Sequence, residues 1–166
     1  MDNEDTKDQF LAVYDEYGSA IYRFCLLKVS SKEQAEDLTQ EVFMRFWQTL
    51  RKQENVDHER ALLYTIARNL IIDWYRKHKE QSLDVLAEAG YEFANEDHKD
   101  IERNAQVREL LGVVHELDHQ SREVVLLRYV EGLSPKDIAT VTGETANAIS
   151  VRLNRAIKKV QQRIRL

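Results

Sequence analysis

The side chains with the clearest potential for chemistry lie near the carboxyl end of the chain. Residues 145–166 hold six bases and no acid. Asn154 and Arg155 carry the groups that hydrogen-bond adenine and guanine edges in a major groove, and Val151 can contact a thymine methyl. Three further bases follow at Lys158, Lys159 and Arg163. These three suit phosphate contact or a solvated helix end that favours the helix dipole.

A second polar group lies in the middle of the chain. Asn69, Asp73 and Arg76 are spaced by four and three residues, so a helix places them on one face. Asparagine is a mediocre helix former, so its position inside a helix indicates that its side chain has a specific partner. Its side chain either binds a ligand or bonds a neighbouring loop. Trp74 and Tyr75 can stack on bases, although aromatic residues at helical spacing are more often part of a core.

A polar stripe is predicted on an earlier helix. Asp37, Gln40, Glu41 and Arg45 follow one another at steps of three, one and four, which keeps them on one side. Composition alone favours a solvated helix face. A stripe of this kind also suits the polar rim of a protein contact.

The sequence offers little for catalysis or for a cofactor. The single cysteine, Cys25, lies among apolar residues and is expected in the core. His115 and His119 are four residues apart, but no third metal ligand is nearby. No nucleophile with a paired base stands out. We therefore expect no metal, no cofactor and no enzymatic activity.

The elements that position the first groups are expected to be three helices. Apolar residues recur at steps of three and four through each of them. The predicted helices run over 6–29, from Ser31 to about residue 50, and over 58–80. Ser31 and Gln34 have capping-box spacing, and Asp57 is expected to cap the third helix.

The second half is expected to hold four more helices. Helical pattern resumes near Asp100 and breaks at residues 118–120. Ser121 is expected to begin a helix that ends at Gly132. The remaining start and stop signals are Ser134 before Pro135, then Gly143, then Thr145. Two helices joined through a glycine turn form the helix-turn-helix layout. In the last helix Ile149, Leu153, Ala156 and Val160 should face the core.

Charge divides the chain into two basic ends and an acidic middle. Residues 60–79 hold five bases and one acid, whereas residues 81–118 hold ten acids and three bases. The formal net charge of −5 opposes unaided binding to DNA. We expect an all-α fold of two helical domains, residues 1–80 and 105–166. A flexible acidic linker over 81–104 should join them.

The sequence resembles a known family at two places. Residues 35–43 read AEDLTQEVF and residues 63–76 read LYTIARNLIIDWYR, which is similar to region two of extracytoplasmic-function sigma factors. Residues 122–134 read REVVLLRYVEGLS, and with the helix-turn-helix they are similar to region four. The ordered pair is highly specific. The family usually has an apolar residue where Glu144 follows the turn glycine, and polar residues where Ala148 and Val151 stand.

The resemblance implies roles for particular residues. Asp37, Gln40, Glu41 and Phe43 would dock on the clamp helices of the largest subunit of core RNA polymerase, and region four would meet its flap. Asn69 would sit at the pocket for a base flipped from the melted minus-ten element. The further minus-ten residues would be Asp73, Arg76 and Lys77. The residues facing the minus-thirty-five duplex would be Ser150, Val151, Asn154 and Arg155.

The resemblance also implies binding partners, and the sequence indicates a cellular location. Promoter DNA and core polymerase are the expected partners, together with an anti-sigma protein, often membrane-bound in this family. The acidic start of the chain and the lack of a long apolar run predict a cytoplasmic protein. Two other readings are a stand-alone helix-turn-helix regulator and a purely structural helical protein. The regulator explains the last 33 residues but not residues 35–76.

Overall fold

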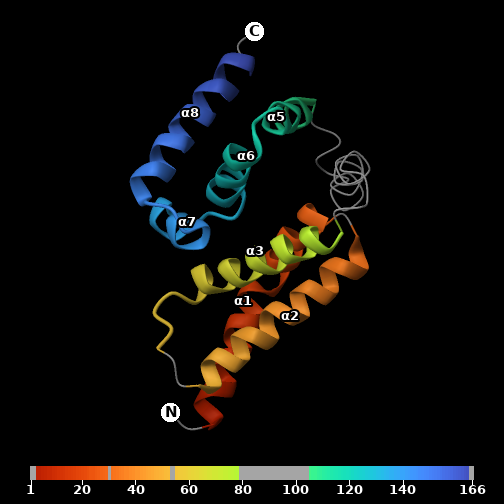
Figure 1. The fold of residues 1–166 in the computed structure, drawn as a ribbon, viewed down its shortest axis with the longest axis vertical. Helices are drawn as coiled ribbons and strands as arrows, with labels where there is room; N and C mark the ends of the chain where they lie inside the picture. The colour runs from red at the N-terminus through yellow and green to blue at the C-terminus, as the bar shows by residue number, and fades with distance from the viewer. Residues whose placement is uncertain (1–2, 30, 53–54, 79–104, 165–166) are drawn as a thin grey trace. The chain divides into compact units, whose positions relative to one another are not determined.

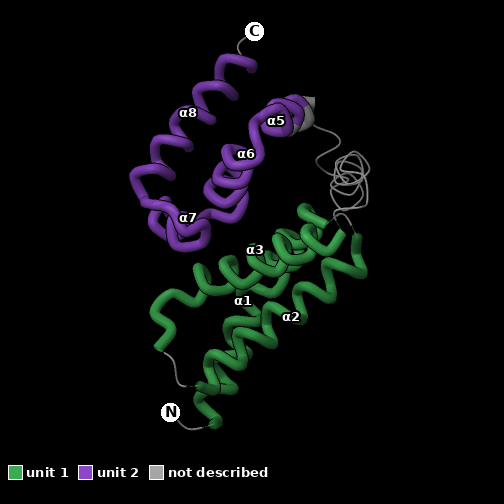
Figure 2. Tube along the Cα trace, in the orientation of Figure 1, with its two compact units in different colours: residues 1–94 green, residues 95–166 purple. Residues whose placement is uncertain are grey.

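The computed structural model describes residues 3–29, 31–52, 55–78 and 105–164, and its regular structure there is entirely helical. The expected all-α fold is therefore confirmed. The chain divides into two compact units, residues 1–94 and 95–166, which Figure 2 colours separately. The linker expected over 81–104 lies outside the described residues, so the domain limits remain a prediction.

In its described residues, unit 1 has three helices that all contact one another: α1 (Asn3–Val29), α2 (Lys32–Arg51) and α3 (Glu59–Lys77) (Figure 1). Ser31 begins α2 as the sequence predicts, because its hydroxyl accepts a hydrogen bond from the Gln34 backbone nitrogen at 3.4 Å. The apolar faces of the three helices meet in one core. Its fully buried members include Ile21, Cys25, Phe46, Leu63 and Tyr64.

An aromatic cluster fills the contact between α1 and α2. The ring centre of Phe10 lies 6.3 Å from that of Phe46 and 5.3 Å from that of Trp47. Tyr14 meets Phe43 edge to face at 4.8 Å. Aromatic pairs in these geometries add to the burial of apolar area. The cluster therefore fixes which side of α2 faces inward.

Three details of unit 1 differ from the sequence prediction. The helix α1 begins at Asn3 rather than at residue 6, and α3 ends at Lys77 with His78 as its C-cap. The Asp57 cap is wrong. The N-cap of α3 is His58, and the Asp57 carboxylate instead accepts a hydrogen bond from the Asn55 amide at 3.0 Å. A carboxylate satisfied by a neighbour two residues away has less need of the helix end.

Over residues 105–164, unit 2 has four α-helices and one π-helical turn: α5 (Ala105–His115), α6 (His119–Val125), η1 (Leu126–Val130), α7 (Pro135–Thr142) and α8 (Ala146–Ile164). The long helix α8 contacts α5, α6 and α7. Its buried residues are the predicted ones, Ile149, Leu153, Ala156 and Val160. The helical pattern expected to resume near Asp100 is described only from Ala105 onward.

The middle helix begins earlier than predicted, and it is not a regular α-helix up to its end. Its cap is Asp118 rather than Ser121, since the Asp118 carboxylate accepts from the Ser121 backbone at 2.9 Å and from the Ser121 hydroxyl at 2.7 Å. After Val125 the helix widens, and the Glu131 nitrogen donates to the Leu126 carbonyl at 3.0 Å. The spacing of apolar residues does not predict a single π-helical turn within an α-helix. Gly132, at φ 71°, ends the segment as predicted.

The turn between α7 and α8 agrees with the sequence prediction. Ser134 caps α7 by accepting from the Asp137 nitrogen at 3.1 Å, and Pro135 is its first residue. Gly143 closes α7 in the left-handed conformation at φ 74°. Thr145 then caps α8, with its hydroxyl accepting from the Ala148 nitrogen at 3.1 Å. The helix-turn-helix is therefore present, with α8 as its second helix.

Candidate nucleic-acid interface and docking face

The polar stripe of α2 is present on the surface of unit 1. Asp37 and Gln40 are exposed, and Glu41 is half-buried. The carboxylate of Glu41 accepts from the Arg45 guanidinium at 2.7 Å, so these two charges partly compensate each other. We call Asp37, Gln40, Glu41 and Met44 the docking face.

Met44 belongs to this face and was not found from the sequence. It lies seven residues after Asp37 and between Gln40 and Glu41 around the helix, at 100° per residue. Its side chain is 50% exposed although it is apolar. An apolar side chain with polar neighbours resembles the centre and rim of a protein interface. The signal in the sequence is the apolar residue at the i, i+7 position of a polar stripe.

Phe43 does not present a free side chain. It is only 3% exposed, and its ring packs against Tyr14 and Phe10 on α1. Burial of this kind gives Phe43 the task of holding α2 in place. Its neighbours on the docking face are the side chains that a partner can reach.

The polar group of α3 is also exposed. Asn69, Asp73, Arg76 and Lys77 all lie on the surface. The nearest atoms of Arg76 and Asp73 are 3.8 Å apart, which makes a loose and well-solvated ion pair. Among the described residues the side chain of Asn69 has no hydrogen bond to a neighbouring loop. The structure therefore leaves the Asn69 side chain exposed on α3.

Trp74 and Tyr75 are half-buried, and both form hydrogen bonds to other helices of unit 1. The Trp74 indole donates to the side-chain carbonyl of Gln34 at 3.1 Å, and the His78 ring stacks on it at 4.4 Å between ring centres. The Tyr75 hydroxyl donates to the backbone carbonyl of Lys28. Burial raises the pKa of Tyr75 above its ordinary value, which keeps this donor protonated. The two aromatic residues thus hold the end of α3 against α1 and α2.

The outward face of α8 carries the predicted reading set. Val151, Asn154 and Arg155 are exposed, and Ser150 is half-buried. Lys158 is exposed one turn beyond Arg155. The buried face lies on the opposite side of the helix, so these side chains are available to a groove. The geometry suits an α-helix that enters duplex DNA with its N-terminal half.

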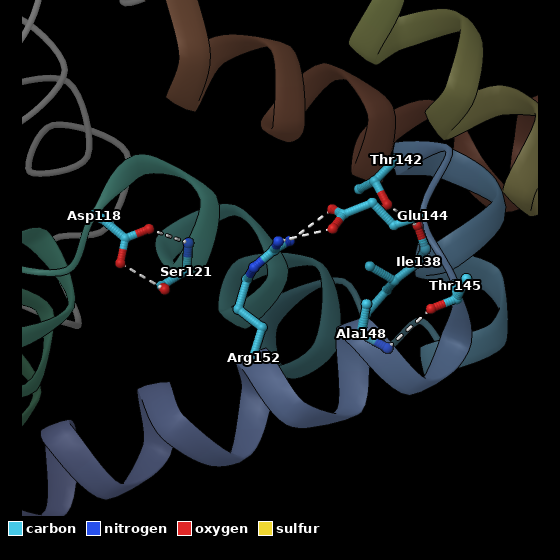
Figure 3. Close-up of polar contacts among 8 residues, drawn as sticks. All are labelled: Asp118, Ser121, Ile138, Thr142, Glu144, Thr145, Ala148 and Arg152. Atoms are coloured by element: carbon cyan, nitrogen blue, oxygen red, sulfur yellow. Dashed lines mark hydrogen bonds and ion pairs between the residues drawn. The ribbon is translucent and has the colours of Figure 1, made fainter.

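One base of α8 has a different environment. The Arg152 guanidinium forms two hydrogen bonds with the carboxylate of Glu144, at 2.6 and 2.7 Å. Figure 3 shows the Arg152 side chain reaching from α8 to the turn that follows α7. Further along, Arg163 pairs with Glu116 at 3.1 Å, and more than half of each of these side chains is exposed. The bases of α8 are therefore not equivalent.

The remaining candidate groups show no reactive arrangement. In the described ranges no cluster of three or more His, Cys, Asp or Glu could hold a metal ion. Cys25 is buried, and burial raises the pKa of its thiol to about 12, so it stays protonated at neutral pH. Among the helices described, none combines the length and the apolar character needed to cross a membrane.

Known proteins resemble this chain over nearly its whole length. Residues 13–81 match the family model for sigma-70 region 2, and residues 108–160 match that for sigma-70, region 4. The ECF RNA polymerase sigma factor SigX of Bacillus subtilis is 26% identical over 168 residues, which cover 96% of this chain and 86% of the relative. The ECF RNA polymerase sigma factor SigL of Mycobacterium tuberculosis is 30% identical, over 90% of this chain and 85% of the relative.

Solved structures show the same fold. The sigma factor RpoE from Bartonella quintana, in a complex with the anti-sigma factor NepR, superposes with a TM-score of 0.64 at 21% sequence identity. The match covers 98% of each chain.

Proposed function

Because this chain belongs to the extracytoplasmic-function sigma factors, which direct promoter-specific initiation by RNA polymerase, we propose that its two units recognise different parts of the promoter. Unit 1 holds the polymerase and traps the melted minus-ten strand. Unit 2 reads the minus-thirty-five element as duplex. The supporting observation is that both family matches fall, in order, on units that expose polar faces. A stand-alone helix-turn-helix regulator leaves the match of residues 13–81 unexplained.

The docking face binds the clamp helices of the largest polymerase subunit. Met44 supplies an apolar contact at the centre, and Asp37 and Gln40 supply polar contacts beside it. Glu41 is already bonded to Arg45 and acts as part of that pair. Phe43 supports this face from beneath, since it is buried against α1. Region four, in unit 2, meets the polymerase flap.

The α3 face binds the non-template strand after melting. Asn69 is exposed and carries both a donor and an acceptor, so it can read the edge of a flipped base. Asp73 lies beside it, and Arg76 and Lys77 add positive charge for phosphates at the end of the helix. Trp74 and Tyr75 are half-buried, and their hydrogen bonds to Gln34 and Lys28 keep this face rigid, so we assign them to support of the face and not to base stacking.

The α8 face binds the minus-thirty-five duplex. Arg155 suits guanine, Asn154 suits adenine, and Val151 suits a thymine methyl. Ser150 lies at the edge of this face, where its hydroxyl accepts or donates. Sequence-independent affinity comes mainly from the polymerase, because the net charge of the chain is negative.

The wider properties follow from the family. The chain works in the cytoplasm beside DNA and polymerase, without catalytic activity or a cofactor of its own. An anti-sigma protein holds it inactive by covering these faces. Support for such a partner comes from the Bartonella sigma factor of the same fold, which was crystallised with the anti-sigma factor NepR. In a mixture with such a protein, the chain should no longer capture core polymerase.

The docking proposal is tested by changing Asp37 and Gln40 to alanine together. The double variant should capture clearly less core polymerase in a pull-down, with helicity unchanged by circular dichroism. Glu36→Ala is the matched control, because it removes an exposed charge that lies outside the docking face on the same helix, about 100° from Asp37 and 40° from Gln40. If the double variant binds polymerase as well as Glu36→Ala does, the docking face is wrongly placed.

The role of Asn69 is tested after the polymerase has bound. Asn69→Ala should reduce open complexes, since the base that it reads is exposed only after melting. Permanganate footprinting measures the melted region, and a polymerase pull-down of the same variant should remain normal. Footprints as strong as those of the wild type would exclude Asn69 from the base pocket.

A further inference from the structure

The turn before α8 holds a residue that departs from the family pattern. Where the family usually has an apolar side chain, this chain has Glu144. Its backbone nitrogen donates to the Ala139 carbonyl at 3.1 Å, and the Gly143 nitrogen donates to the same carbonyl at 2.9 Å. The backbone of Glu144 is therefore tied to the end of α7. A charge introduced at this point needs a partner.

That partner is Arg152, eight residues along and on α8. Each terminal nitrogen of its guanidinium donates one hydrogen bond to one oxygen of the Glu144 carboxylate (Figure 3). The two side chains are only 23% and 32% exposed, so water screens them less than it screens the pair of Arg163 and Glu116. The hydrogen bonds that Arg152 donates to Glu144 raise the pKa of Arg152 above its ordinary value, and the charges of Asp118 and Glu123 act in the same direction.

A two-bond arginine–carboxylate pair fixes distance and also orientation, because the planar fork must face the carboxylate. One end of this pair lies in the turn that is bonded to the end of α7, and the other lies on α8. A helix turns by 100° for each residue, so a small rotation of α8 about its axis moves Arg152 off Glu144. The same rotation would move Asn154 and Arg155, which lie two and three residues after Arg152 on α8.

We propose that Glu144 and Arg152 form a positioning pair that sets the rotation of α8 against α7, and thereby selects which base edges of the minus-thirty-five element Asn154 and Arg155 reach. This inference rests on the proposed reading role of unit 2. It makes Glu144 a determinant of specificity although it touches no base. It also removes Arg152 from the phosphate contacts, because its charge is already compensated inside the unit.

Transcription in vitro tests the pair in the full chain bound to core RNA polymerase. The template library is randomised across the minus-thirty-five element, upstream of a promoter that the wild type transcribes. Glu144→Gln removes the charge, and Arg152→Lys keeps the charge but loses the fork. Glu116→Gln is the matched control, since it weakens the exposed ion pair with Arg163 on the same helix.

Both pair variants should change the order of preference in the library. The expected shift is roughly fivefold or more at one position, the lower end of what a well-aligned base contact contributes. Glu116→Gln should keep the wild-type order. A phosphate contact tolerates lysine, so an Arg152→Lys variant with the wild-type order overturns the positioning role. If circular dichroism shows that Glu144→Gln folds poorly, the order of preference of Arg152→Lys alone tests the positioning role.

A salt titration supplies a second readout. Arg152→Gln should leave the salt dependence of promoter binding unchanged, because no phosphate contact is lost. A slope of log affinity against log salt reduced by about one would assign Arg152 to a phosphate and overturn the inference. A wild type without any minus-thirty-five preference would instead contradict the proposed function of unit 2. The two failures are therefore distinguishable.

Discussion

Units 1 and 2 position their exposed faces by different means. In unit 1, α2 and α3 are fixed by large side chains, such as the buried Phe46 and Tyr64 and the Trp74 that bonds Gln34. In unit 2, α8 follows a left-handed glycine, a threonine cap and the pair of Glu144 and Arg152. Apolar burial is large and non-directional, whereas caps and ion pairs are small and directional. We therefore expect unit 1 to resist polar changes and unit 2 to be sensitive to them.

The largest effect expected from this contrast follows from Phe46→Ala. The change removes a fully buried ring that packs against Phe10, and it should lower the free energy of unfolding of unit 1 by about 3–5 kcal/mol. Both tryptophans, Trp47 and Trp74, lie in unit 1. Tryptophan fluorescence during urea unfolding therefore reports on this unit, and far-UV circular dichroism reports on both.

Met44→Ala is the control for that change. It truncates a half-exposed apolar side chain on the same helix, and surface changes of this kind usually stay within about 0.5 kcal/mol. Met44→Ala should nevertheless weaken polymerase capture, which Phe46→Ala does only by unfolding. If the fluorescence transition of Phe46→Ala coincides with that of the wild type, aromatic burial does not hold unit 1 together.

The next effect concerns specificity and compares two bases of α8. Arg155→Ala should lower transcription and flatten preference among minus-thirty-five variants, because a two-bond arginine–guanine contact gives about 1–3 kcal/mol of discrimination. Lys158 stands one turn further along, where the helix leaves the groove. Lys158→Ala should cause a smaller loss with preference unchanged. Reporter output across a promoter library measures both, and an Arg155→Ala variant with the wild-type ranking would reduce Arg155 to a phosphate contact.

A smaller effect is expected at the turn of unit 2. Gly143 has φ 74°, and an added Cβ would meet no atom within 4 Å. Gly143→Ala should therefore cost only the backbone penalty of a left-handed residue, about 1–2 kcal/mol. Gly112→Ala is the contrasting variant, since an added Cβ there also meets open space but the residue lies inside α5. It should stabilise by about 0.5–1 kcal/mol. Urea unfolding followed by circular dichroism would show the opposite signs, and a neutral Gly143→Ala would contradict the strain argument.

The sequence predicted the parts of this fold that depend on local chemistry. Ser134, Gly143 and Thr145 act within four residues of their own positions, so their types alone predict the turn. Helical spacing likewise predicted the buried face of α8 and the exposed face of α3. Those predictions needed no knowledge of how the helices pack.

Features that depend on distant partners were not predictable. The hydrogen bond of Trp74 needs Gln34, which is 40 residues away. The Asp57 cap is a local exception, since its carboxylate accepts from Asn55 only two residues away. Phe43 was expected at an interface, but contacts with α1 bury it. The partner of Glu144 is eight residues away across a turn, so no helical spacing rule indicates it. Sequence patterns describe faces, and tertiary contacts decide which faces remain open.

The smallest effect expected is a pH dependence at the cap of α6. Two hydrogen bonds from Ser121, one from its hydroxyl and one from its backbone, hold the pKa of Asp118 below its ordinary value. A carboxyl with a lowered pKa in the folded state favours folding above its unfolded pKa of about 3.9. That contribution is lost as the pH falls through the lower pKa of the folded state. Because the cap is exposed, water limits its size.

Asp118→Asn isolates this titration, since asparagine caps a helix about as well as aspartate but carries no proton to gain. Unfolding in urea followed by circular dichroism, repeated between neutral pH and about pH 3, should show less acid destabilisation in the variant than in the wild type. All other carboxyl groups titrate in both proteins, so the difference belongs to Asp118. In unit 1 the cap of α2 is Ser31, which does not titrate, and the tryptophan signal should show no such difference between the two proteins. Equal acid destabilisation of both proteins would mean that the Asp118 bonds do not favour its ionised form.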